Sequence, residues 1–146
     1  MTTPNNKYAA MSQEYMARAE DYLRQGDLKQ ASEKSWGATA CALKSIAEGR
    51  GWHHQSHSLL FDISNQVIDE LGRPDLRDMF QSAKSMHQNF YENWEHEEGV
   101  EYAIGRIKEY LAELESVSPQ LPASFTVETR AQRRRLERLA GQSAPL

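Results

Sequence analysis

Four side chains of the segment 74–94 have the chemistry to act together on an anion. Arg77, Lys84 and Tyr91 repeat every seven residues, and His87 lies beside them on the same helical stripe. Guanidinium, ammonium and phenol groups donate hydrogen bonds, which suits a phosphate or another anion. An imidazole beside them could act as a general acid or base. The alternative reading is a packed core histidine, with basic side chains that border an apolar face and keep their charges in water.

A second group of histidines, His53, His54 and His57, lies close in sequence to Arg50 and Trp52. Adjacent histidines seldom point at one ion, and no carboxylate or thiol stands at helical ligand spacing beside them. The sequence therefore predicts a polar loop here, and neither a metal site nor a bound cofactor.

The charge of the chain is divided unevenly. Residues 1–120 hold 12 basic and 19 acidic side chains, a net −7, and residues 121–146 hold 5 basic and 2 acidic ones, a net +3. An acidic body excludes a general phosphate-coating surface, so contact with nucleic acid must be local or come from the tail. The tail arginines are the candidates for binding nucleic acid or an acidic partner: Arg130, Arg133, Arg134, Arg135 and Arg138.

Helical periodicity in five successive segments predicts an all-α protein. The expected helices span residues 8–25, 27–48, 58–71, 74–94 and 97–116. We expect an antiparallel up-and-down bundle of four to five helices over residues 1–117, a linker over 118–126, and an Arg-rich tail over 127–146. In the tail, Thr126 is expected to cap a short basic helix, which is disordered alone or docked on a partner.

Composition indicates a cytoplasmic protein. Cys41 is the one cysteine of the chain, which excludes a disulfide framework and favours a small buried thiol in a reducing compartment. No apolar run has the length of a membrane span, and the first residues lack the apolar stretch of a signal peptide. A Gly-Asp turn before Ala31 is also typical of a tetratricopeptide repeat, but that fold needs about three copies of the unit.

Two motifs give the sequence a resemblance to a known family. They are Gly26-Asp-Leu-Lys-Gln-Ala-Ser-Glu-Lys-Ser-Trp-Gly-Ala38 and His87-Gln-Asn-Phe-Tyr-Glu92. With them, residues 10–116 resemble the PaREP1-like branch of the HEPN superfamily. The resemblance implies a helical bundle of four or five helices that commonly dimerises. Many HEPN proteins are metal-independent ribonucleases of toxin, anti-phage or CRISPR-linked systems, and others are non-catalytic partners of nucleotidyltransferases.

The catalytic pattern of that superfamily is Arg, four to six residues, then His near the start of the last core helix. Here Arg77 precedes His87 by ten positions, Arg106 has no following His, and the one match, Arg50 to His57, follows the second expected helix. About one such match is expected by chance, so it carries little weight.

The resulting hypothesis is a homodimeric, HEPN-like binding module without the usual dyad, in a toxin–antitoxin or defence-type nucleic-acid system. RNA and a nucleotidyltransferase are its candidate partners. The alternatives are a divergent metal-independent ribonuclease whose dimer cleft surrounds His87, and a tetratricopeptide-like interaction domain.

Overall fold

The chain folds into six helices, and the residues described, 7–141 of the computed structural model, contain no strand. The helices are α1 (Lys7–Arg24), α2 (Leu28–Arg50), α3 (His57–Leu71), α4 (Asp75–Glu92), α5 (Glu97–Glu115) and α6 (Arg130–Leu139). The all-α class is therefore confirmed. Each of the first five helices lies within a few residues of its predicted position.

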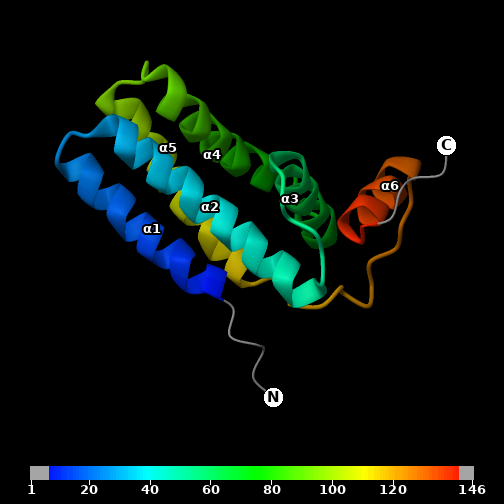
Figure 1. The fold of residues 1–146 in the computed structure, drawn as a ribbon. Coiled ribbons are helices and arrows are strands. Elements are labelled where there is room, and N and C mark those ends of the chain that lie inside the picture. Colours follow the sequence, from blue (N-terminus) through cyan, green and yellow to red (C-terminus); the bar gives the residue numbers. More distant parts are fainter. Residues whose placement is uncertain (1–6, 142–146) are drawn as a thin grey trace.

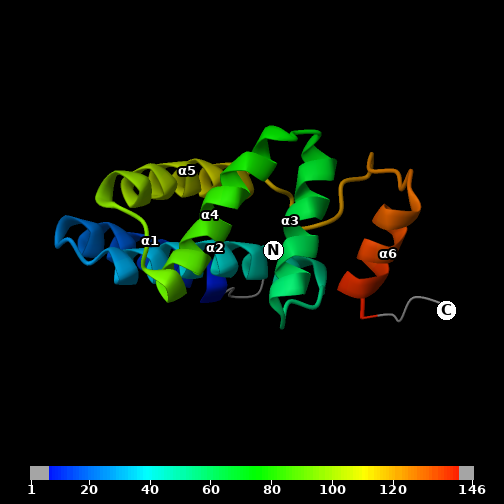
Figure 2. The same cartoon turned by 90° about the horizontal axis from the view of Figure 1, so that it is seen from above.

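Helix α2 lies at the centre and contacts α1, α3, α4 and α5, while α6 packs on α3 (Figure 1). Seen from above, α1, α2 and α5 run alongside one another, α4 lies obliquely, and α3 crosses them (Figure 2). The arrangement thus departs from a simple up-and-down bundle at α3. The helices surround α2 rather than stacking as repeated pairs, which is not the architecture that tetratricopeptide repeats form.

Gly26 and Asp27 form the turn between α1 and α2. Gly26 adopts a positive φ of 79°, and the Asp27 carboxylate accepts a hydrogen bond of 3.1 Å from the Gln30 backbone N–H. The antiparallel pair packs closely because α2 presents small residues to α1. A Cβ on Gly37 would lie 3.4 Å from the Tyr15 ring, and the Ser12 hydroxyl donates to the Ala38 carbonyl at 2.7 Å.

The core contains one phenol that is buried completely. Tyr110 on α5 shares a hydrogen bond of 2.6 Å with Ser64 on α3, and burial raises the pKa of its hydroxyl. Cys41 is also buried, and burial raises the pKa of its thiol.

Among the described helices, none is both long and apolar enough to cross a membrane.

Capping side chains set two helix starts that the sequence predictions place elsewhere. Helix α3 begins at His57 rather than residue 58, because the Ser56 hydroxyl accepts the Leu59 N–H and caps the helix. Helix α6 is capped by Thr129 rather than Thr126, because Thr129 forms a capping box with Gln132.

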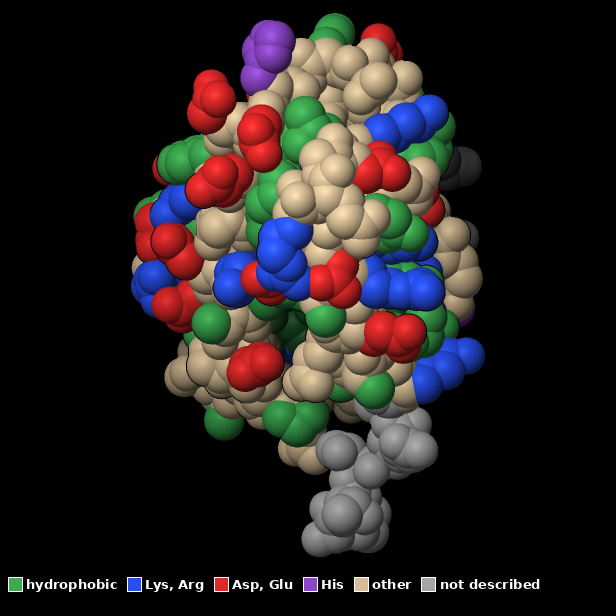
Figure 3. Space-filling model, turned by 90° about the vertical axis from the view of Figure 1, so that its left-hand side faces the viewer, with side chains coloured by type: hydrophobic (Ala, Val, Ile, Leu, Met, Phe, Trp, Pro, Cys, Tyr) green, Lys and Arg blue, Asp and Glu red, His purple; other side chains and the backbone are tan. Residues whose placement is uncertain are grey.

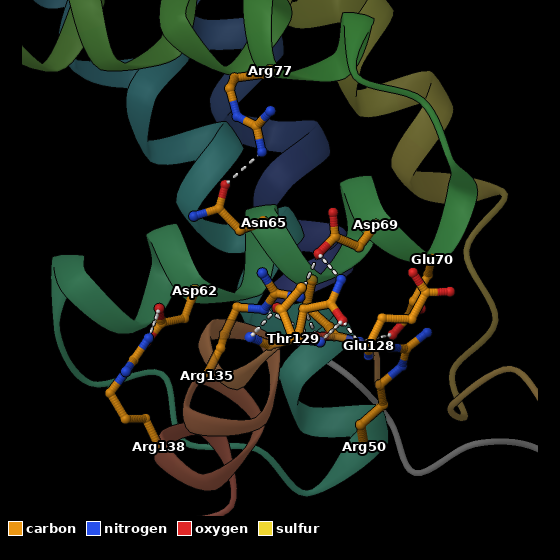
Figure 4. Close-up of polar contacts among 12 residues, drawn as sticks. Arg50, Asp62, Asn65, Asp69, Glu70, Arg77, Glu128, Thr129, Arg135 and Arg138 are labelled. Atoms are coloured by element: carbon orange, nitrogen blue, oxygen red, sulfur yellow. Dashed lines mark hydrogen bonds and ion pairs between the residues drawn. The ribbon is translucent and has the colours of Figure 1, made fainter. Parts of the chain in front are cut away.

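A buried ion pair ties the end of α2 to α3. The Arg50 guanidinium donates to the Glu70 carboxylate at 2.6 Å, and only 1% and 3% of the two side chains are exposed. Arg50 also donates to the Ser118 carbonyl at 2.8 and 3.2 Å, which holds the segment after α5. Gln66 donates to the same carboxylate at 3.0 Å. The pair therefore fixes three parts of the chain at one point (Figure 4).

Helix α6 docks on α3 of its own chain through the same network. Arg135 donates to Gln66 at 2.9 and 3.0 Å and to Asp69 at 2.7 Å, and Arg138 binds both oxygens of Asp62 at 2.9 Å. The basic segment of the tail is therefore an ordered helix, and it is held in cis by acidic side chains of α3.

We predict that the Arg50–Glu70 pair is a main determinant of stability. Glu70→Ala leaves the guanidinium buried without its partner, which is expected to lower the free energy of unfolding by about 3–5 kcal/mol. Urea unfolding followed by circular dichroism measures the change. Asp21→Ala is the control, because it breaks the exposed pair with Arg24 and is expected to cost less than about 1 kcal/mol. Equal, small losses in both variants would contradict the prediction.

Candidate functional site

The seven-residue repeat on α4 lies beside α3. Arg77 donates to the side-chain oxygen of Asn65 at 3.3 Å, and the Lys84 ammonium lies 4.8 Å from the centre of the Phe61 ring. Tyr91, at the end of the same row, is 71% exposed. Arg77 and Lys84 of the predicted row therefore lie against α3, and Tyr91 is exposed further along α4.

The structure brings two histidines together at one end of this row. The rings of His57 on α3 and His87 on α4 lie 4.6 Å apart between centroids, at an interplanar angle of 66°. Tyr91 lies 5.4 Å from His87 on the solvent side, and the buried Trp36 of α2 lies 4.8 Å from it on the core side. His57 is exposed and His87 half-buried, so the imidazole pair is open to a ligand.

We call this surface the α3–α4 strip. It consists of His57, Phe61 and Asn65 on α3 with Arg77, Lys84, His87 and Tyr91 on α4.

The electrostatics of the strip favour an anion. Among the described residues, neither Arg77 nor Lys84 forms an ion pair, so both charges are available. Burial lowers the pKa of His87, and the neighbouring His57 lowers it further. The neutral form of His87 is therefore favoured near neutral pH. Its unprotonated ring nitrogen can accept a proton on the same surface where Arg77 and Lys84 can donate hydrogen bonds.

The formal Arg50–His57 match does not form a dyad in space. Arg50 bonds to Glu70 near the end of α3, whereas His57 is the first residue of that helix. At about 1.5 Å per residue, thirteen positions along a helix separate the two sites by about 20 Å. Arg50 therefore braces the fold, and His57 belongs to the strip.

The tail arginines divide into two groups. Arg135 and Arg138 hold α6 on α3. Arg130 and Arg133 are exposed and Arg134 half-exposed, and within the described part of the chain these three form no ion pair.

The two motifs that carry the family resemblance pack against each other. Ser32 of the first motif accepts a hydrogen bond of 2.9 Å from the Asn89 amide of the second, and both residues are fully buried. The Asn89 oxygen accepts the backbone N–H groups of Trp94 and Glu95 at 2.9 and 2.8 Å, which ends α4. Asn89 thus sets the position of the helix end that bears His87 and Tyr91.

Sequence reasoning missed His57 as the partner of His87. From the sequence, His57 is placed in a polar loop and only its spacing from Arg50 is noted. The available signal was Ser56, a good N-cap residue, which makes His57 the first residue of a helix. With α3 and α4 packed as neighbours, that position lies opposite the end of α4.

A separate groove opens on another face of the molecule. It has a volume of about 1140 Å³ and lies between α1, α2 and α5, with Met16, Ile46 and Leu111 in its lining. Figure 3 shows the hollow, with hydrophobic side chains inside it and charged side chains around its rim. No residue of the α3–α4 strip lines it.

Within residues 7–141, no three histidine, cysteine or acidic side chains are grouped so that they could hold a metal ion.

We predict that the contact with His57 contributes to the lowered pKa of His87. His57→Gln removes the neighbouring charge and is expected to raise the pKa of His87, which stays below its ordinary value because burial remains. A folded-state pKa below the unfolded one gives stability that is full above pH 6.5 and is lost as the pH falls. Imidazole NMR titration measures the shift, and His96→Gln, in the exposed connection after α4, is the control. An unchanged His87 midpoint in His57→Gln would contradict the contact.

Comparison with known proteins identifies the family of the chain. No curated protein and no solved structure matches it. Residues 7–111 match the profile of the archaeal PaREP1/PaREP8 family, a span that runs from the start of α1 into α5 and includes the whole α3–α4 strip. The match covers more than half of the sequence and leaves α6 outside it. The chain therefore belongs to the archaeal PaREP1/PaREP8 family.

Proposed function

We propose that the chain is a HEPN-like binding module that holds RNA along the α3–α4 strip. The observation that carries the proposal is the pair of cations, Arg77 and Lys84, which form no ion pair among the described residues and lie in a row that ends at two adjacent imidazoles. Guanidinium and ammonium groups bind phosphate oxygens strongly, and an exposed tyrosine ring can stack on an unpaired base. The acidic body repels a polyanion elsewhere, so the contact is local.

RNA binding at the strip depends on its two cations. In Arg77→Gln/Lys84→Gln, the affinity for a short single-stranded RNA is expected to fall about tenfold or more, because hydrogen bonds to charged groups contribute about 1.5–3 kcal/mol each. The slope of log affinity against log salt should decrease by about 1.4, since each phosphate contact on a single strand contributes about 0.7. Fluorescence anisotropy over a salt series measures both quantities.

The matched control is Arg18→Gln/Arg24→Gln, which removes the same charge from α1. It should change the affinity and the slope much less. If the two double variants bind RNA equally well, the strip is not the binding site.

A second candidate function is metal-independent RNA cleavage, and the His57–His87 contact favours it. One neutral imidazole can accept the proton of the ribose 2′-hydroxyl while a second, protonated one donates to the leaving oxygen. Lys84, three positions before His87, would neutralise that phosphate, and Arg77, about 15 Å from His87 along the helix at about 1.5 Å per residue, would bind a neighbouring phosphate. His87→Ala and Lys84→Ala are expected to abolish cleavage of single-stranded RNA. Cleavage that is unchanged in these variants, or absent from the parent protein, rejects this candidate.

The proposal includes a homodimer and a role beside a nucleotidyltransferase in a toxin–antitoxin or defence-type system. The resemblance of residues 10–116 to the PaREP1-like branch of the HEPN superfamily supports both. Sedimentation at high micromolar concentration tests the dimer, and a purely monomeric protein would contradict that part. Formation of a stable complex with a purified nucleotidyltransferase encoded beside this chain tests the partner.

A further inference from the structure

The arginines of α6 are divided by the helix into an inner and an outer set. Positions 135 and 138 face α3, where Arg135 is 8% exposed and Arg138 binds both oxygens of Asp62. Arg133 and Arg134 lie three and four residues after Arg130, so these three side chains adjoin one another on a neighbouring face of the helix, with Arg134 one turn before Arg138. The inner pair anchors the helix, and the other three, which we call the outer set, lie beside that anchor, with Arg130 and Arg133 exposed and Arg134 half-exposed.

The positive charges of the outer set are not neutralised by ion pairs within residues 7–141. None of its three guanidiniums forms an ion pair within residues 7–141, although Glu128 and Glu137 line the same hollow of about 460 Å³. Cations outnumber carboxylates there three to two. Because α6 is docked on α3, the backbone that carries these cations is already ordered, and a ligand does not have to order a flexible segment.

The outer set and the α3–α4 strip flank the same helix. α4 and α6 both pack on α3, and Figure 4 shows Arg77 and Asn65 on one flank of α3 with Arg135 and Arg138 on the other. On α3, Ser58 near the start of the helix is exposed, and Asn65, two turns further along, is half-exposed. A helix is about 10 Å across, so a ligand that reaches both cation groups must carry negative charge repeated along its length. A nucleic-acid strand has this property, because every nucleotide carries a phosphate.

We infer that α6 extends the RNA-binding surface. Arg130, Arg133 and Arg134 contact the phosphates of a strand whose other part lies on the α3–α4 strip, across the exposed face of α3. This inference rests on the proposed function for its ligand. It assigns a binding surface to a part of the chain that lies outside the family match.

The test compares three variants of the full chain, with a short single-stranded polyuridine as the probe. Arg130→Gln/Arg133→Gln/Arg134→Gln is expected to weaken binding about tenfold or more at low salt and to reduce the salt slope by about 2, at about 0.7 per lost contact. Its thermal unfolding should match that of the parent, because exposed side chains away from the anchor contribute little to stability. The control Arg18→Gln/Arg24→Gln/Lys29→Gln removes the same charge from α1 and α2 and should leave the slope nearly unchanged.

The third variant, Arg77→Gln/Lys84→Gln, separates failure of this inference from failure of the proposed function. RNA binding that depends on Arg77 and Lys84 but not on the outer arginines overturns the α6 surface alone. A parent protein that binds no RNA overturns both. If the outer-arginine variant loses binding to a polyglutamate peptide while its RNA affinity is unchanged, the surface serves an acidic protein and the inference is wrong.

Discussion

The buried Arg50–Glu70 ion pair joins the ends of α2 and α3 to the segment after α5, and α6 docks on the same network. One guanidinium joins the end of α2, the end of α3 and the Ser118 carbonyl after α5. Gln66 carries the same network to Arg135 of α6. Two buried charges are costly unless every hydrogen-bonding site is used, so the network specifies one arrangement of α3 against α2. That arrangement places the start of α3 beside the end of α4, where the two histidines meet.

Periodicity predicted the class and most helices, because α1, α2, α4 and α5 each bury one apolar stripe. It did not predict the docking of α6, since that helix has no continuous apolar stripe: Leu139 is buried in the core and Leu136 packs against it, while Arg135 and Arg138 pair with acidic side chains of α3. Polar pairing between residues about seventy positions apart leaves no periodic signal. The orientation of α3 has no periodic signal either, because its ion-pair partners Arg50 and Arg135 lie on two other helices, far away in the sequence.

The sequence predicts the residues that α4 contributes to the candidate site, but not those that α3 contributes. The spacing of Arg77, Lys84 and Tyr91 placed them on one edge of α4, and the structure shows them beside α3. Which side chains face them depends on how α3 crosses the bundle, and a single sequence does not reveal this. The sequence therefore indicates only a loop position for His57 and a chance spacing from Arg50, whereas the ring of His57 contacts that of His87.

The central claim is that the two imidazoles and the cations beside them form one ligand surface. Imidazole NMR spectra recorded while a short single-stranded RNA is added test it most directly. We expect the resonances of both His57 and His87 to shift together and saturate, while those of His96, in the exposed connection between α4 and α5, stay in place. RNA binding that leaves the His57 and His87 resonances unmoved would contradict it.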